Sequence, residues 1–331
     1  MKNKNIVVIG GGTGSFTALT GLKKHPVNLT AVITTMDSGG SSGRLRDELG
    51  VLPPGDIRQC LVALSTSPRA LRSLFNYRFS EGELRGHTLG NILLSGLEKI
   101  TGDLGKAIKV AEQILRIQGK VVPVTLDRTE LCVELMDGSV IEGETHIDVL
   151  EKTIKRAKIK RAFLDKEVSA NKDAITAFEK ADAIVIGPGD LYTSIIPNLL
   201  VPGVSLAIRA SKAIKIFVMN VMTKRGQTTN YKALDHIRDL EKYIGKGVIN
   251  VVLVNDKKPT KKTLGWYEEY EEKPVENDVK GQYRVVSADL MREAIISDNS
   301  SDELRRGIIR HHPVKLAHEL LKIINSKQAQ K

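Results

Sequence analysis

The stretch IVVIGGGTGS at residues 6–15 decides the fold. Its four apolar residues predict a strand buried in a parallel sheet, and the glycines after them predict a tight turn into a helix. Glycine permits positive φ in such a turn and lets a phosphate approach the backbone closely. The first N–H groups of the helix and its dipole then favour an anion. The candidate phosphate-binding residues are Gly10, Gly11, Gly12, Thr13, Gly14 and Ser15.

Two standard phosphate-binding motifs can be compared with this turn. A P-loop needs a lysine after its last glycine, whereas Gly14 is followed by Ser15, so the sequence argues against the kinase and ATPase classes. The dinucleotide fingerprint fits at Gly10 and Gly12 but has Ser15 at its sixth position. This departure weakens an NAD site without excluding it. A tight turn that binds no ligand is the structural alternative.

Apolar runs without alternation recur along the chain, with amphipathic helical patterns in most of the intervals between them. The runs lie at residues 6–9, 29–34, 183–186, 214–219 and 248–254. Continuous apolar strands that alternate with helices are typical of a parallel sheet covered on both faces. The sequence therefore predicts an α/β fold with a doubly wound, mostly parallel, Rossmann-like sheet.

We expect one domain over residues 1–331 with two departures from this rhythm. Asp137-Gly138 lies between two strand-like runs and is a strong hairpin signal, which predicts a small inserted β-hairpin lobe around residues 120–165. Residues 256–282 contain the charged runs KKPTKK and EEYEEKP and the only tryptophan, Trp266. They predict an exposed excursion, either an ordinary long loop, which we favour, or a lid or partner surface.

Composition limits the partners and the compartment. The chain has 331 residues and a formal net charge of +11, but aromatic residues make up only 4% and no nucleic-acid-binding motif is present, so we expect no nucleic-acid partner. Cys60 and Cys132 lie in apolar surroundings without metal-ligand spacing, as expected in a reducing compartment. No signal peptide or membrane-length apolar run is evident. We therefore expect a cytoplasmic protein without a membrane partner, in which His311 and His312 lie in a loop before a terminal helix.

The segment after the second predicted strand combines a carboxylate, a run of small residues and arginines. It reads TTMDSGGSSGRLR at residues 34–46. An acidic residue here fits a ribose-binding position of a dinucleotide fold, but the Gly/Ser run forms a second nest for an anion. The candidate binding residues are Asp37, Ser38, Gly39, Gly40 and Arg44.

A second carboxylate follows in GVLPPGDIRQC at residues 50–60, where two prolines and a glycine place Asp56 at the start of a helix. Asp37 and Asp56 together could bind Mg²⁺, which takes one or two carboxylates besides water and phosphate oxygens. The alternatives are an Asx turn at Asp37 and a helix N-cap at Asp56, and they are as well supported locally.

Three further polar loops complete the candidate site. RGHTLGN offers His87 and Asn91 at the start of an apolar helix, with His87 as a binder or an acid–base candidate. The remaining candidates follow two later strands and are Gly187, Gly189, Asp190, Asn220 and Thr223. Because the loops after parallel strands meet at one edge, these residues predict a nucleotide-type ligand. GxSxG, HExxH and an identifiable Cys–His pair are absent, so the sequence offers no covalent nucleophile.

Seven motifs, in order and over nearly the whole chain, resemble those of the bacterial gluconeogenesis factor family, within the superfamily of 2-phospho-L-lactate transferases. They are GGGTGS, TTMDSGGSSGRLR, LPPGDIRQ, FNYRF, GHTLGN, GPGDLYTS and NVMTKRGQT. The resemblance implies a cytoplasmic regulator that binds a nucleotide sugar, UDP-N-acetylglucosamine, without a redox NAD or flavin. It further implies a homodimer, a protein partner in envelope-precursor metabolism, and a role in envelope-precursor supply and cell shape on gluconeogenic carbon sources.

The transferase branch supplies the alternative function. It resembles a Mg²⁺-dependent enzyme that moves a phospholactyl group from a nucleotide-linked donor, with acidic metal ligands that match Asp37 and Asp56. His87 joins these two as a candidate catalytic residue. The version NVMTKRGQT resembles the regulator's loop and favours the regulator. His312 departs from the acidic residue expected before Pro313, so the resemblance carries little weight for the C-terminal helix.

Overall fold

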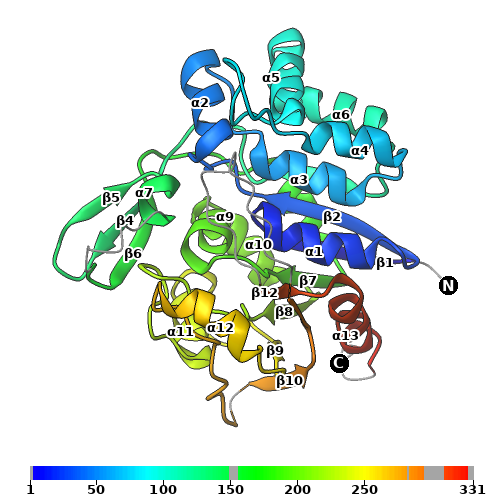
Figure 1. The fold of residues 1–331 in the computed structure, drawn as a ribbon. Coiled ribbons are helices and arrows are strands. Elements are labelled where there is room, and N and C mark those ends of the chain that lie inside the picture. The colour runs from blue at the N-terminus through cyan, green and yellow to red at the C-terminus, as the bar shows by residue number, and fades with distance from the viewer. Residues whose placement is uncertain (1–2, 149–155, 282, 294–308, 327–331) are drawn as a thin grey trace.

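A seven-stranded parallel sheet forms the body of the protein in the computed structural model, which describes residues 3–148, 156–281, 283–293 and 309–326 (Figure 1). The strand order is β10-β9-β8-β7-β1-β2-β3, and every pair in it is parallel. The strands are β1 (Lys4–Gly10), β2 (Val27–Ile33), β3 (Lys120–Pro123), β7 (Ala183–Ile186), β8 (Ile214–Val218), β9 (Val251–Asn255) and β10 (Arg284–Ala288). The predicted doubly wound sheet is confirmed, and β3 and β10 extend it at its two edges.

The strand order places a ligand crevice beside β1. From β1 the chain builds outward through β2 and β3, and it then returns to the other side of β1 as β7 and continues through β8, β9 and β10. Loops after β1 and β7 therefore leave the sheet in opposite directions. In open α/β sheets such a switch point opens a crevice outside the carboxyl ends of the strands.

Alternate side chains of β1 belong to two different cores, one on each face of the sheet. Ile6 and Val8 pack in one cluster, whereas Val7 and Ile9 pack in the other. The first face is covered by α1 (Gly12–Leu22), α3 (Gly55–Leu64), α4 (Arg69–Asn76), α5 (Leu89–Thr101), α6 (Leu104–Leu115) and α13 (Pro313–Asn325). The second is covered by η1 (Leu191–Ile195), α8 (Lys172–Glu179), α9 (Ile196–Leu200), α10 (Val204–Ala210) and α11 (Ala233–Ile244).

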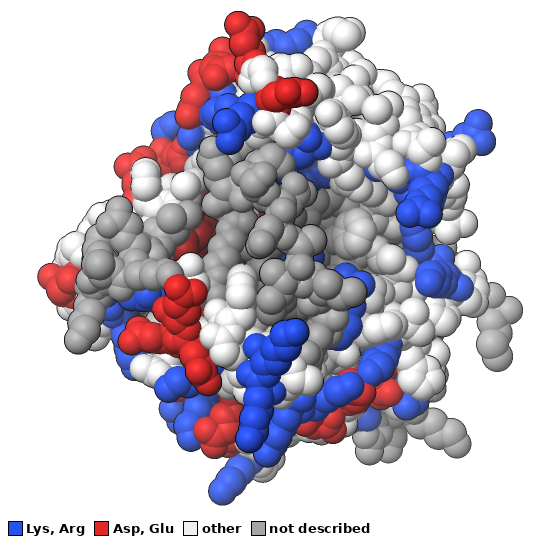
Figure 2. Space-filling view, viewed as in Figure 1, with Lys and Arg blue, Asp and Glu red and all other residues white. Residues whose placement is uncertain are grey.

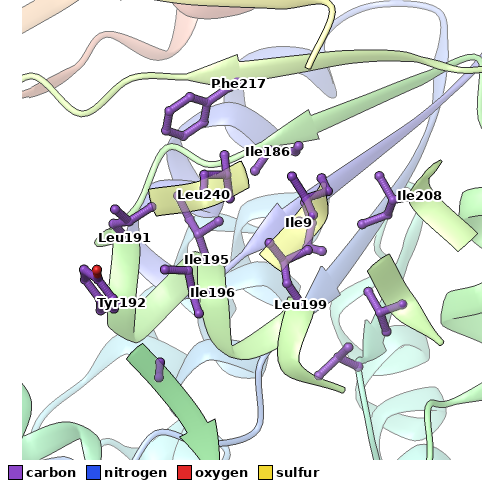
Figure 3. Close-up of a cluster of buried hydrophobic side chains, with 14 of the residues drawn as sticks. Ile9, Ile186, Leu191, Tyr192, Ile195, Ile196, Leu199, Ile208, Phe217 and Leu240 are labelled. Atoms are coloured by element: carbon purple, nitrogen blue, oxygen red, sulfur yellow. The ribbon is translucent and has the colours of Figure 1, made fainter. Parts of the chain in front are cut away.

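Figure 3 shows the second core where Ile9 and Ile186 of the sheet meet the side chains of η1, α9 and α11. No single helix among the described residues is long and apolar enough to cross a membrane. The segment Leu191–Leu200 passes that test only together with Val204–Ala210, at a bend of 84°. Leu191, Ile195 and Ile208, from these helices, are buried in this core.

An antiparallel three-stranded sheet forms the predicted lobe. Its order is β5-β4-β6, with β4 (Leu131–Leu135), β5 (Val140–Glu142) and β6 (Ile159–Leu164). Gly138 has φ 87° in the β4–β5 turn, as the Asp-Gly signal predicts. The boundary of residue 120 was too early, because Lys120–Pro123 pairs with β2 in the main sheet. Residues 149–155 of the lobe lie outside the described residues.

Most of residues 256–281 are exposed, as their charge predicts, but the segment is not the ordinary long loop that we favoured. They contain α12 (Lys261–Glu268), which is N-capped by Thr260 and buries Tyr267. The apolar side of this short helix packs on the loop after β8 and on β12 (Ile309–His311), so a third small core forms there. Residue 282 lies outside the described residues.

The predicted loop at His311 and His312 is also corrected. His311 is the last residue of β12, which pairs antiparallel with β11 (Met291–Glu293), and it is buried. His312 caps α13, since its Nδ1 accepts a hydrogen bond from the Val314 N–H at 3.3 Å. This pair of histidines therefore divides between a strand and a helix cap.

Candidate functional site

One cavity of about 600 Å³ lies along the carboxyl ends of β1, β2, β7 and β8. It extends from α2 (Gly40–Leu49) at one end to α12 and β12 at the other. Its volume lies within the range typical of small-molecule and cofactor sites. The predicted residues that line it are Gly12, Thr13, Gly14, Asp37, Gly39, Gly40, Arg44, Asp56, Asn91, Gly189, Asp190, Asn220 and Thr223.

The other predicted residues lie behind the cavity wall. They are Gly10, Gly11, Ser15, Ser38, His87 and Gly187. Ser38 binds the lobe, because its Oγ accepts a hydrogen bond from the Thr145 N–H at 3.1 Å. The direct contacts of these six residues with a ligand stay a prediction.

Close packing accounts for the glycines of the β1–α1 turn. Gly11 is the N-cap of α1 and has φ −101°, and none of the turn's glycines has positive φ, which corrects one reason given for them. A Cβ on Gly12 would lie 2.4 Å from Asp56 Oδ1, and a Cβ on Gly14 would lie 1.8 Å from the Pro188 carbonyl oxygen. The start of α1 thus fits between α3 and the loop after β7, with its N-terminus at the cavity.

The two predicted carboxylates meet at the start of α3. Asp37 forms the Asx turn, since its Oδ1 accepts a hydrogen bond from the Gly39 N–H at 2.8 Å. Its other oxygen, Oδ2, lies 2.6 Å from where a Cβ on Gly55 would stand. Asp56 is in the first turn of α3, whose N-cap is Pro54, so the N-cap interpretation of Asp56 is wrong. Both carboxylates face the cavity.

The lobe contributes two further carboxylates that the sequence analysis missed. Glu144 and Asp148 lie one helical turn apart on α7 (Glu144–Asp148) and line the cavity. Burial, followed by repulsion from Asp37, raises the pKa of Glu144 well above its usual range. Burial raises the pKa of Asp148 to about 6, against the opposing effect of Lys224. The only local signal was their spacing directly after Gly143.

One basic side chain, Lys224, lies near these carboxylates at the cavity wall. Lys224 Nζ lies 3.8 Å from Asp190 Oδ2, and the charge of Asp190 raises the pKa of this lysine. Asp148 Oδ1 accepts hydrogen bonds from Thr193 Oγ1, at 3.2 Å, and from Gln227 Nε2. The loop after β8 and the lobe are thereby connected through charged and polar contacts at the cavity wall.

A buried polar network supports the end of the cavity near α2. Asn91 Oδ1 accepts a hydrogen bond from Arg58 Nε at 2.9 Å, and Asn91 Nδ2 donates to Ser41 Oγ at 3.0 Å. His87 Nδ1 lies 3.0 Å from the same Ser41 oxygen, and burial followed by Arg44 lowers the His87 pKa. His87 therefore supports Ser41 behind the wall, and Asn91 orients Arg58 at the cavity.

Metal binding can be tested against these donors. The described residues contain no group of three or more His, Cys, Asp or Glu side chains arranged to hold a metal ion. Mg²⁺ does not need one, because it keeps several waters and takes one or two carboxylates together with substrate phosphates. Glu144 Oε2 is buried without a hydrogen-bond partner among the described residues. The carboxylates of Asp37 and Asp56 are hard oxygen donors at the cavity and fit a hydrated Mg²⁺ bound through them.

The comparisons with known proteins agree with this architecture. The model of the family described as 2-phospho-L-lactate transferase CofD matches residues 6–294. A gluconeogenesis factor of Halalkalibacterium halodurans is 47% identical over 257 residues, which are 77% of this chain and 78% of that protein. The gluconeogenesis factor of Bacillus subtilis is 38% identical over 321 residues, which are 96% of this chain and 98% of that one.

A solved structure shares the whole fold. The crystal structure of a Bacillus halodurans protein has a TM-score of 0.88 and 39% sequence identity, and the match covers 97% of this chain and 100% of that one. The chain belongs to the 2-phospho-L-lactate transferase (CofD) family, in the group whose members are named gluconeogenesis factors.

Proposed function

We propose that this gluconeogenesis factor binds a nucleotide sugar, UDP-N-acetylglucosamine, in the cavity at the sheet edge. The observation that carries the proposal is the cavity's composition along its length. The N-terminus of α1 lies at its middle, polar and basic groups of α2 and α3 lie at one end, and Trp266 and Tyr267 lie at the other. The middle of the cavity suits a diphosphate, the end at α2 and α3 suits a sugar, and the aromatic end suits a base.

Magnesium is part of the same proposal. A diphosphate beside the carboxylates of Asp37 and Asp56 would meet like charge, so a cation is needed between them. Asp37 and Asp56 would hold Mg²⁺, which supplies charge neutralisation of the phosphates. Arg44, Arg58 and Lys224 bind and orient the anionic part of the ligand from the surrounding wall.

The regulatory role rests on the relatives' names and on the motif NVMTKRGQT, which resembles the regulator's version of this loop. We propose that the protein acts in the cytoplasm as a homodimer with a protein partner of envelope-precursor metabolism, and supports precursor supply and cell shape during growth on gluconeogenic carbon sources. On the face drawn in Figure 2, the described Lys and Arg side chains lie in several separate groups, some beside Asp and Glu and others among uncharged residues. This distribution supports a metabolite ligand over nucleic acid.

The alternative is a Mg²⁺-dependent transferase of a phospholactyl group from a nucleotide-linked donor, and the description of the matching family favours it. The cavity could bind such a donor as well. In that case Asp37 and Asp56 would hold the metal, and the attacking hydroxyl would need orientation by the cavity wall.

Isothermal titration calorimetry distinguishes the two functions. We expect saturable binding of UDP-N-acetylglucosamine that is strengthened by Mg²⁺ and lost in Gly12→Asp, whose side chain would meet Asp56 and Gln59. The matched control is Gly96→Asp, at a helical glycine whose Cβ position has no atom of another described part of the chain within 4 Å. No heat with any uridine nucleotide sugar would refute the proposal. Product formation from an authentic phospholactyl donor and acceptor would establish the transferase.

A further inference from the structure

The end of the cavity at α12 and β12 has a chemistry that the phosphate and metal site does not use. Trp266 and Tyr267 line it with ring centroids 4.7 Å apart at 78°, and Tyr267 is buried. The Ile309 N–H donates a hydrogen bond to Tyr267 Oη at 2.8 Å, which fastens α12 to β12. Tyr267 thus supports Trp266, which is only half-buried and can offer its ring for stacking a nucleobase.

His311 adds a polar group to this aromatic end. It lines the cavity, and only 5% of its surface is exposed. Its Nε2 is buried and has no hydrogen-bond partner among the described residues, whereas its ring hydrogen-bonds the backbone of Met219. The Met219 carbonyl can only accept, so Nδ1 carries the hydrogen and Nε2 presents a lone pair.

Burial keeps this ring neutral. It lowers the pKa of His311 to about 4, so the side chain carries no proton on Nε2 at neutral pH. A neutral ring with this tautomer is only an acceptor at Nε2. Buried acceptors without a partner are uncommon and costly in folded proteins, and a ligand donor would satisfy this one.

We propose that the α12–β12 end of the cavity is the base site, in which neutral His311 accepts a hydrogen bond from the ring N–H of uracil and so selects uridine over cytidine nucleotides. This inference rests on the proposed function and adds the residue that reads the base. Uracil carries a hydrogen at N3. Cytosine has a lone pair at N3, which would face the lone pair of His311.

The first test changes the ligand and leaves the protein intact. UDP, CDP and N3-methyl-UDP are titrated into the wild-type protein with Mg²⁺, and Trp266, the only tryptophan, reports binding by its fluorescence. We expect UDP to bind at least about tenfold more tightly than the other two, because each of them leaves the buried acceptor unsatisfied. Equal affinities would overturn the base assignment while nucleotide binding stands. Absence of UDP binding would overturn both this inference and the proposed function.

The second test changes the residue. His311→Phe keeps a ring of similar shape but has no acceptor. The variant should therefore bind UDP and CDP with about equal affinity. The control is His318→Phe, on an exposed position of α13, which should keep the wild-type ratio. An unchanged preference in folded His311→Phe would refute the role of His311. Should this variant fail to fold, the N3-methyl-UDP comparison decides alone.

Discussion

Gly14→Ala should push α1 away from the loop after β7, and the phosphate-binding turn depends on the contact between these two elements. A Cβ at residue 14 would lie 1.8 Å from the carbonyl oxygen and 2.5 Å from the carbonyl carbon of Pro188. The separation from the oxygen would have to grow to at least 3.0 Å, the closest approach that real Cβ atoms make. Both partners are backbone, so no side chain can rotate away, and α1 must move from the loop after β7.

The expected cost combines two opposing contributions. Overpacking of this kind destabilises by about 1–3 kcal/mol. Alanine regains about 0.5–1 kcal/mol over glycine inside a helix. The net loss of up to about 2.5 kcal/mol corresponds to a decrease in Tm of up to about 4 °C for a chain of this length. A displacement on this scale at the α1 N-terminus should also weaken nucleotide binding at least about tenfold.

Gly96→Ala is the matched control for this substitution. Gly96 is also inside a helix, α5, but among the described residues outside its own helical turn no atom lies within 4 Å of its Cβ position. Its replacement should raise stability by about 0.5–1 kcal/mol and leave UDP-N-acetylglucosamine binding unchanged. Urea unfolding and calorimetry on the two variants measure both effects. A stabilised Gly14→Ala protein with wild-type affinity would refute the close-packing explanation of this turn.

Four other substitutions test the charges and hydrogen bonds. Asp37→Asn and Asp56→Asn should each abolish the gain in nucleotide affinity that Mg²⁺ gives the wild type, and calorimetry with and without Mg²⁺ would contradict the metal site if that gain persists. The pKa of Asp148 is about 6 in the folded protein and about 4 in the unfolded chain. Between about pH 4 and about pH 6 the folded state therefore binds more protons than the unfolded state. The free energy of unfolding should fall as the pH rises through this range. Asp148→Asn should remove this dependence and stabilise the protein relative to wild type more at pH 7.5 than at pH 5, and a pH-independent difference in urea midpoints would count against it. Tyr192→Phe removes the 2.6 Å hydrogen bond to Asp239 Oδ2 and should cost about 1–3 kcal/mol in urea unfolding, whereas a neutral effect would show that this buried bond contributes nothing.

The central strands of the sheet could be predicted because burial on both faces leaves a continuous apolar signal. Ala183–Ile186 and Ile214–Val218 are buried at every residue. The edge strands gave weaker signals. Lys120–Pro123 is short and ends in proline, and Arg284–Ala288 contains no fully buried residue. These two segments belong to the main sheet because each pairs with a neighbouring strand, and a local sequence pattern does not predict such pairing.

The glycine-rich part of the site was predictable for a similar local reason. A strand that ends in glycines and enters a helix has a recognisable spacing, and Gly12, Asp37 and Gly189 line the cavity as their loops suggested. Glu144 and His311 belong to segments with no such signal. Each reaches the cavity only because a lobe or a small strand folds back over the sheet edge, so the tertiary structure was needed to find them.

The most direct test of the account is a crystal structure of the protein with UDP-N-acetylglucosamine and Mg²⁺. We expect the diphosphate at Gly12 and Gly14, the metal at Asp37 and Asp56, and the uracil against Trp266 and Tyr267 with N3 in contact with His311. A ligand bound away from the α1 N-terminus, or density for a nucleotide at another surface, would contradict the claim that these remote loops form one nucleotide-sugar site.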